Sequence, residues 1–193
     1  KNLNLIDVAE NVSEFWKINN TFAKSVETRE GNPEFVFYEG PPSANGMPGI
    51  HHVMARALKD IFCRYQTQNG KQVFRKAGWD THGLPVELGV EKELGITKED
   101  IGKKISIEDY NKACREAVMR YTDVWNHLTE KIGYWVDLED PYITYKSKYM
   151  ETVWWLLKQL YSKELLYKGY TIQPYSPKAG TGLSSHELNQ PGT

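Results

Sequence analysis

Hydrophobic residues along the first eighty positions fall into helical stripes and short continuous runs. Apolar residues at 8, 12, 15 and 16 recur at helical spacing, which predicts a helix over 6–18 followed by a polar loop over 19–33. The run FVFY at 35–38 is apolar on both faces, which indicates a strand covered on both sides. From 50 to 65 the spacing predicts a helix with one buried stripe, and QVFRKAGWD at 72–80 is typical of a second strand.

This order of strand, glycine-rich turn, helix, turn and strand predicts a βαβ unit with parallel strands, and so an α/β fold. Further helices follow. Ser106, with Asp109 three residues later, is typical of the start of a long helix that runs to Gly133. Another helix is expected over 149–161, and the Gly-, Pro- and Ser-rich tail predicts loops or short strands of a separate small element.

Composition narrows the class of protein without naming a partner. The chain has 193 residues, 40% of them hydrophobic, and a formal net charge of -1, which excludes disordered and strongly basic classes. Nucleic acid would have to bind through a local patch. The sequence contains no apolar stretch long enough for a membrane span and no signal peptide pattern, so we expect a cytoplasmic protein without a membrane partner.

Two further features concern the cysteines and the chain ends. Cys63 and Cys114 form no CxxC pair, so a reducing compartment is expected; Cys114 falls on an apolar stripe and Cys63 does not. The chain starts at Lys1 rather than Met and stops at Thr193 without a helix end or charged tail. We therefore expect a fragment of a longer protein.

Candidate chemistry lies in the turn after the first strand, where βα loops of parallel sheets bind ligands. A helix that opens there presents unpaired N–H groups and a positive dipole end, which favour phosphate. The turn glycines permit close approach of a ligand, and His51 and His52 can donate to phosphoryl oxygens. Two alternatives are a capped helix with solvated histidines, and a metal site of His51, His52 and His82. Adjacent helical histidines point about 100° apart, which disfavours the metal.

The second strand ends in GWDTHGLPVE, which puts Asp80 at the carboxyl edge beside the first turn. Its carboxylate can hold an α-ammonium group through a charge-assisted contact. The alternative, which is compatible with the first, is that Asp80 caps a helix beginning near Leu84. A phosphate-seeking helix end and an ammonium-seeking carboxylate together favour a reaction between ATP and an amino acid.

Four stretches then resemble one family. EGPPSANG (39–46), GWDTHGLPVE (78–87), YWVDLEDPYIT (134–144) and WWLLKQLYSKELLYKG (154–169) are similar to the N-terminal part of isoleucyl-tRNA synthetases, which are class I enzymes. The similarity runs from about residue 11 to the end. It implies an N-terminal helix and loop over 1–32, the first half of a Rossmann-like catalytic domain with added helices over 33–168, and the root of the editing insertion over 169–193.

The implied activity is ATP-dependent activation of L-isoleucine and its transfer to tRNA(Ile), with Mg²⁺ entering as the ATP complex. We expect a monomer, and a fragment that is inactive or very weak alone. A valyl- or leucyl-type synthetase is the nearer alternative, and a noncatalytic RNA-binding or scaffold piece is the other. The resemblance assigns Gly40, Pro41 and Asp80 to the amino acid, Asn45, Gly49, His51 and His52 to ATP, and catalysis to His52 and His51.

Two departures from the family pattern matter. Where the signature reads His-x-Gly-His, this chain has Gly49-Ile50-His51-His52, with the first histidine and the glycine exchanged. We expect a working variant, and a weakened site is the alternative. Relatives often carry a Cys-x-x-Cys zinc pair where this chain has Ser176 and Ala179, which cannot replace two thiolates, so no metal is predicted there. The triplet 146–148 (KSK) resembles the second class signature but is expected to be a solvated helix start.

Overall fold

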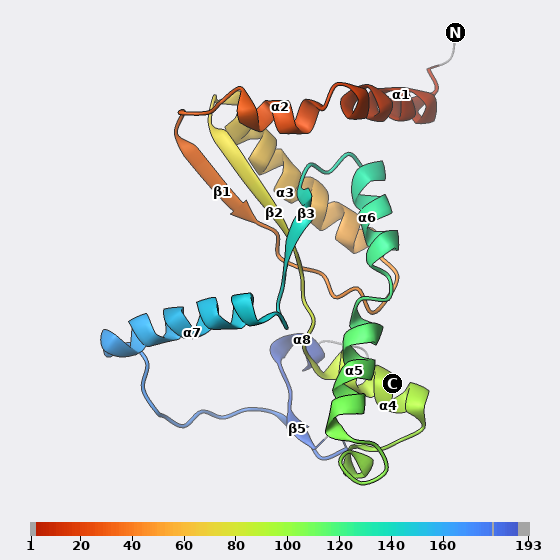
Figure 1. The fold of residues 1–193 in the computed structure, drawn as a ribbon, viewed down its shortest axis with the longest axis vertical. Coiled ribbons are helices and arrows are strands. Elements are labelled where there is room, and N and C mark those ends of the chain that lie inside the picture. Colours follow the sequence, from red (N-terminus) through yellow and green to blue (C-terminus); the bar gives the residue numbers. More distant parts are fainter. Residues whose placement is uncertain (1–2, 179, 189–193) are drawn as a thin grey trace. The chain divides into compact units, whose positions relative to one another are not determined.

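The computed structural model describes residues 3–178 and 180–188, in which helices and strands alternate as in an α/β protein (Figure 1). The chain divides into two units, Lys1–Met150 and Glu151–Thr193, which are described separately. In the first unit the elements are α1 (Leu5–Ile18), α2 (Thr21–Glu27), β1 (Glu34–Tyr38), α3 (Ile50–Gln68), β2 (Gln72–Trp79), α4 (Leu84–Leu94), a 3₁₀ turn (Lys98–Asp100), α5 (Ile107–Val118), α6 (Thr122–Lys131) and β3 (Asp137–Ile143).

The three strands of the first unit form one parallel sheet in the order β1-β2-β3. β1 and β2 are in register from Glu34 opposite Gln72 to Tyr38 opposite Lys76. α3 connects them and lies along one face of the sheet (Figure 1). The predicted βαβ unit and the α/β fold class are confirmed. Both strands therefore end at the same edge of the sheet, which is where the candidate site was expected.

α3 packs against the sheet through a different face from the predicted one. Its buried residues are Arg56, Cys63 and Thr67, and the Arg75 guanidinium of β2 donates to Thr67 Oγ1 at 2.9 Å. A buried arginine on the strand needs polar partners on the helix, so polar residues face inward. The prediction that the apolar stripe is buried is wrong, and Cys63, which falls off that stripe, is buried instead. The exposed stripe residues are Ile50, Met54, Leu58, Ile61, Phe62 and Tyr65.

The two faces of the sheet differ in the same way. Val73, Arg75 and Ala77 are buried on the face that α3 covers. Val36 and its register partner Phe74 lie on the opposite face and are 54% and 41% exposed. The FVFY strand is therefore covered on one side, and the prediction of cover on both sides is wrong for this chain.

Two helical segments also differ from the sequence prediction. α2 occupies part of the expected loop over 19–33, where Phe22 packs against Trp135 with ring centroids 5.8 Å apart. The long helix expected from Ser106 is divided into α5 and α6, and at the division Tyr121 N donates to Ala44 O at 3.0 Å. This contact with the first turn replaces helical continuity. The ends are as predicted: Ser106 Oγ accepts from the N–H three residues on, and Gly133 follows α6 with a φ of 68°.

β3 was not predicted as a strand. Its segment DLEDPYI is rich in charged residues, and Pro141 has no N–H for the sheet ladder. The pairing with β2 is irregular: the register shifts between Lys76 and Gly78. Tyr142 lies over Gly78, where an added Cβ would come within 2.3 Å of the ring. The glycine thus lets the tyrosine cross the sheet edge beside the site.

The remaining elements begin at α7 (Ser147–Ser162), which confirms the helix expected over 149–161 and the helix start at KSK. In the second unit, β4 (Tyr175–Ser176) and β5 (Thr181–Gly182) form an antiparallel pair, followed by α8 (Ser185–Leu188). Ser176 and Ala179 were predicted to bind no zinc, and Ala179 lies outside the described residues. Among the helices of the described residues, none has the length and apolar character needed to cross a membrane.

Candidate active site

The turn after β1 and the end of β2 are joined by a backbone hydrogen bond. Asp80 N donates to Pro42 O at 3.0 Å, so the loop from Gly40 to Gly49 lies against the carboxyl end of the second strand. Asp80 is half-buried there. The structure thereby brings Asp80, the residue predicted to bind the ammonium group, alongside the predicted phosphate-binding turn.

The start of α3 fixes the orientation of His52. Gly49 is the N-cap, and its backbone N–H donates to His52 Nδ1 at 2.9 Å. Since Nδ1 accepts this bond, the proton of the neutral imidazole lies on Nε2, which is free to donate to an anion. His52 N donates to Gly49 O at 3.0 Å, so in the first turn the N–H groups of Ile50 and His51 are the ones that can bind the same ligand.

His51 and His52 lie together despite their adjacent positions. Their ring centroids are 3.8 Å apart with a tilt of 42°, and the His51 ring also lies over Gly49. Burial lowers the pKa of the His52 imidazole below its ordinary value, and the charges of His51, Arg56 and Lys59 lower it further. His52 therefore stays neutral at pH 7, with Nε2 as a hydrogen-bond donor.

The turn after β2 is held by the end of β3. Thr144 Oγ1 accepts from Thr81 N at 3.0 Å and lies 2.9 Å from His82 Nδ1. His82 is exposed, and its backbone N–H lies 3.4 Å from Asp80 Oδ1. α4 begins after Gly83 without a side-chain cap, so the alternative that Asp80 caps this helix is wrong.

Glu39, at the end of β1, is a buried charge that the sequence reasoning missed. It is 3% exposed; its carboxylate pairs with Lys59 of α3 and accepts from the Tyr134 hydroxyl, while its carbonyl accepts from Tyr142. Lys59 Nζ also donates to Gly40 O at 3.3 Å. Burial and the Glu39 hydrogen bond raise the pKa of Tyr134 above its ordinary value, so it remains a neutral donor. Glu39 anchors the base of the loop. Its position directly after the FVFY strand is the sequence feature that could have indicated this role.

Trp125 of α6 lies in a segment that the sequence predicted only as part of a long helix. Its indole Nε1–H donates to Gly46 O at 2.9 Å, and its ring meets the His52 ring edge-on, with centroids 4.7 Å apart. The guanidinium of Arg56 lies 4.9 Å from the Trp125 ring centroid on α3's side. No sequence pattern connects residues this far apart, so only the fold reveals the contact.

The alternative metal site finds no support in the geometry of the described residues. The His51 and His52 rings contact each other at a tilt of 42°, and His82 Nδ1 lies against Thr144 Oγ1. No group of three or more His, Cys, Asp or Glu side chains there is placed to hold a metal ion. The expected absence of zinc near Ser176 stays a prediction.

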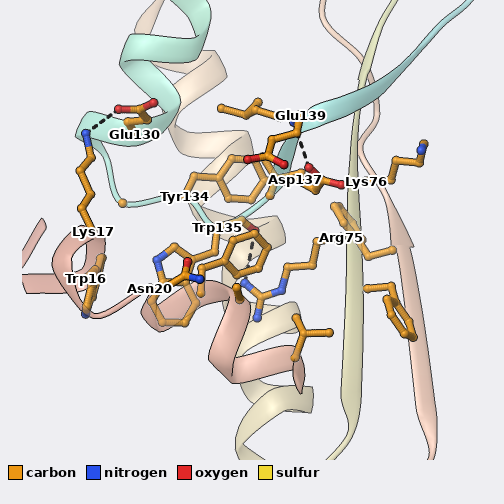
Figure 2. Close-up of a pocket in the computed structure, with 18 of the residues that line it drawn as sticks. Trp16, Lys17, Asn20, Arg75, Lys76, Glu130, Tyr134, Trp135, Asp137 and Glu139 are labelled. Carbon is orange, nitrogen blue, oxygen red and sulfur yellow. Dashed lines mark hydrogen bonds and ion pairs between the residues drawn. The ribbon is translucent and has the colours of Figure 1, made fainter. Parts of the chain in front are cut away.

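A cavity of about 780 Å³ lies elsewhere in the first unit (Figure 2). It is lined by the aromatic side chains of Trp16, Phe22 and Trp135 and bordered by the ion pair of Lys17 with Glu130, whose Nζ and Oε2 are 2.7 Å apart. Among the described residues that line it are none of the predicted site residues. The cavity is therefore separate from the site at the strand ends.

Comparison with known proteins gives a consistent result. The sequence profile of the class I tRNA synthetases (I, L, M and V) matches residues 11–192. The isoleucine–tRNA ligase of Cytophaga hutchinsonii is 70% identical over 193 residues, which are 100% of this chain and 17% of that protein. The isoleucine–tRNA ligase of Bacteroides fragilis is 72% identical over 188 residues, 97% of this chain and 16% of that protein.

One more distant relative and one solved structure are also similar to this chain. The isoleucine–tRNA ligase of Streptomyces coelicolor is 55% identical over 180 residues, 93% of this chain and 17% of that protein. A crystal structure of Agrobacterium radiobacter K84 LeuRS, in a ternary complex with tRNA and LeuAMS, gives a TM-score of 0.59 at 21% identity and covers 92% of this chain and 20% of that one. The chain spans about 17% of the length of the relatives it matches most fully.

Proposed function

This chain belongs to the class I tRNA synthetases of the I, L, M and V group, and from that premise we propose that it is the N-terminal part of an isoleucine–tRNA ligase. Such an enzyme joins the carboxylate of L-isoleucine to the α-phosphorus of ATP and releases pyrophosphate. The acyl group then passes to the terminal adenosine of tRNA(Ile). The observation that carries the proposal is the hydrogen bond of Asp80 N to Pro42 O, which unites the two halves of the site.

The amino-acid half consists of Gly40, Pro41 and Asp80. The half-buried carboxylate of Asp80 accepts from the α-ammonium group of isoleucine, a charge-assisted contact that fixes the orientation of the zwitterion. Gly40 and Pro41 present backbone to the amino acid at the end of β1, where Lys59 Nζ and the buried Glu39 hold the chain in place. The isoleucine carboxylate is thereby directed toward the helix end.

The ATP half consists of Asn45, Gly49, His51 and His52. The N-terminus of α3 attracts the phosphates, and the Nε2–H of His52 donates to a phosphoryl oxygen whose negative charge grows in the transition state. His51, whose ring centroid lies 3.8 Å from that of His52, supplies a second imidazole to the same oxygens. Mg²⁺ enters with ATP. The chemistry needs only positioning and electrostatic stabilisation, with no covalent enzyme intermediate.

Isoleucine is favoured over valine and leucine because relatives named isoleucine–tRNA ligases match nearly the whole chain at about 70% identity. The site also favours an enzyme over the noncatalytic RNA-binding alternative, since Asp80 and His52 have no role in that reading. We place the catalytic portion at 33–168 and the root of the editing insertion at 169–193. A cytoplasmic monomer, without zinc at Ser176 and Ala179, completes the proposal.

The decisive experiment is isoleucine-dependent exchange of pyrophosphate into ATP by the full-length protein that carries this chain, with valine and leucine as competing substrates. We expect Asp80→Ala to raise the KM for isoleucine by about tenfold or more, as expected for loss of a charge-assisted hydrogen bond. His52→Ala should lower kcat on the order of a hundredfold, because it removes a donor to developing charge.

Asp123→Ala is the matched control for Asp80, because this aspartate lies exposed on α6. It should leave both constants unchanged. Wild-type kinetics in both Asp80→Ala and His52→Ala would refute the site assignment. Exchange that depends on valine or leucine rather than isoleucine would refute the substrate.

A further inference from the structure

We propose that Trp125 is a positioning residue that holds the first turn and the His52 imidazole in one fixed arrangement; this inference rests on the proposed function. Trp125 is 2% exposed, so its ring is shielded from any substrate in the site. It acts through the groups that it touches.

The first of these groups is the backbone of the loop. Nε1–H of Trp125 donates to Gly46 O at 2.9 Å, and the ring packs with the fully buried Ala44. Tyr121 N, at the start of the same helix, donates to Ala44 O at 3.0 Å. α6 thus fixes both sides of Asn45, which is assigned to ATP.

The second group is the imidazole itself. The edge-on contact with the indole, at 4.7 Å between centroids and 71° between planes, fixes the ring plane of His52. The hydrogen bond from Gly49 N to Nδ1 fixes its rotation within that plane. Together they leave Nε2 in one direction.

Trp125 is itself held by contacts with α3 and with its own helix. Arg56 of α3 lies over the indole at 4.9 Å and donates from NH1 to Thr129 Oγ1 at 2.6 Å. Thr129 Oγ1 in turn donates to Trp125 O at 2.7 Å. Trp79, the residue before Asp80, completes the cluster with Trp125. The indole therefore connects the loop, α3 and the end of β2 at one point.

The test is Trp125→Phe in the full-length protein, which keeps an aromatic ring and removes the donor to Gly46 O. Displacement of reacting groups by about 1 Å costs on the order of a hundredfold in rate, so we expect kcat for pyrophosphate exchange to fall by about ten- to a hundredfold. The KM for ATP should rise. The KM for isoleucine should stay within about twofold, because Asp80 and Gly40 are held by other contacts.

Trp135→Phe is the matched control. Trp135 packs against Trp16, with centroids 5.0 Å apart, and against Phe22, so the same substitution there alters a tryptophan cluster formed with α1 and α2 rather than with the loop. A merely structural role predicts similar losses in both variants and a rise in both KM values. Either result would overturn the proposal, as would wild-type kinetics in Trp125→Phe.

A double-mutant cycle with His52→Ala adds a readout specific to positioning. If Trp125 acts through His52, Trp125→Phe should cost much less kcat in the His52→Ala background than in the wild type. Equal cost in both backgrounds would overturn the inference. Melting temperatures verify folding; if Trp125→Phe does not fold, Trp125→Tyr takes its place in the same comparison. Absence of isoleucine-dependent exchange in the wild type would instead refute the proposed function.

Discussion

The imidazole of His51 lies where a side chain on residue 49 would begin. A Cβ added to Gly49 would come within 2.8 Å of His51 Cε1 and 3.0 Å of Nδ1. In the family signature the histidine precedes the glycine, whereas here their order is reversed. The reversed pair keeps an imidazole beside residue 49 because the His51 ring folds back over the glycine. This geometry favours the working variant over the weakened site.

We therefore predict that Gly49→Ala acts mainly by displacing His51. The φ of Gly49 is -105°, which alanine adopts without strain, so the melting temperature should change little. We expect kcat for pyrophosphate exchange to fall by about three- to tenfold, equivalent to roughly 0.7–1.4 kcal/mol. In a His51→Ala background the same substitution should be nearly neutral, since the contact is already absent.

Gly89→Ala serves as the control for the alanine substitution. A Cβ at this helical position meets nothing within 4 Å, so kinetics should be unchanged and stability unchanged or slightly higher. Additive effects of Gly49→Ala and His51→Ala would show that the two residues act separately and would contradict the compensation.

Sequence reasoning proposed candidate site residues within single stretches of the chain, and their roles stay predictions. The turn from Gly40 to His52 and the strand end at Asp80 were found because βα loops of parallel strands meet at one edge. It missed Trp125, whose partners lie about 75 residues away and whose helical spacing fits a core position equally well. It missed Glu39 because a carboxylate beside a turn is ordinarily solvated.

At the scale of the elements, Glu39 joins β1 to α3 and to the segment before β3. Its partners are Lys59 and Tyr134, and its burial leaves little access for water. We predict that Glu39→Gln in the full-length protein lowers the free energy of unfolding, taken from the first transition, by about 2–3 kcal/mol. This loss of stability lies at the low end of the range for a buried ion pair, because the Lys59 side chain is 31% exposed and stays partly hydrated.

Urea denaturation followed by tryptophan fluorescence measures this loss, with Glu93→Gln as the control. Glu93 forms an exposed pair with Arg120, with side chains 53% and 47% exposed, so its removal should cost at most about 1 kcal/mol. Equal destabilisation by the two substitutions would mean that the Glu39 pair does not hold the elements together.

Patterns of hydrophobic residues predicted most elements but not which faces they bury. α1, α3 and α7 were found because their helical periodicity is strong, and β1 and β2 because each is a short strand-forming run bounded by turn residues. β3 was missed because Pro141 and the acidic residues conceal it. Periodicity identifies the apolar face of a helix but not which part of the protein packs against it. The polar face of α3, which is buried against the sheet, was therefore expected to face solvent.

At the scale of the whole molecule, the exposed apolar faces need explanation. On α3, Leu58 is 55% exposed and Phe62 is 67% exposed; on the sheet, Tyr38 is 61% exposed. Contiguous apolar patches of this kind on soluble proteins mark surfaces that contact other protein. Because the relatives are about six times longer than this chain, we expect residues outside the 193 to cover these faces.

This expectation predicts opposite outcomes for one substitution in two contexts. Phe62→Lys should improve the solubility of the isolated chain and reduce its binding of the apolar dye ANS, because a charge replaces an exposed ring. In the full-length protein it should cost about 3 kcal/mol or more, since the lysine is then buried without a partner. Gln68→Lys, on an exposed polar position of the same helix, should be neutral in both contexts. Phe62→Lys that leaves the melting temperature of the full-length protein unchanged would show that this face of α3 stays in solvent.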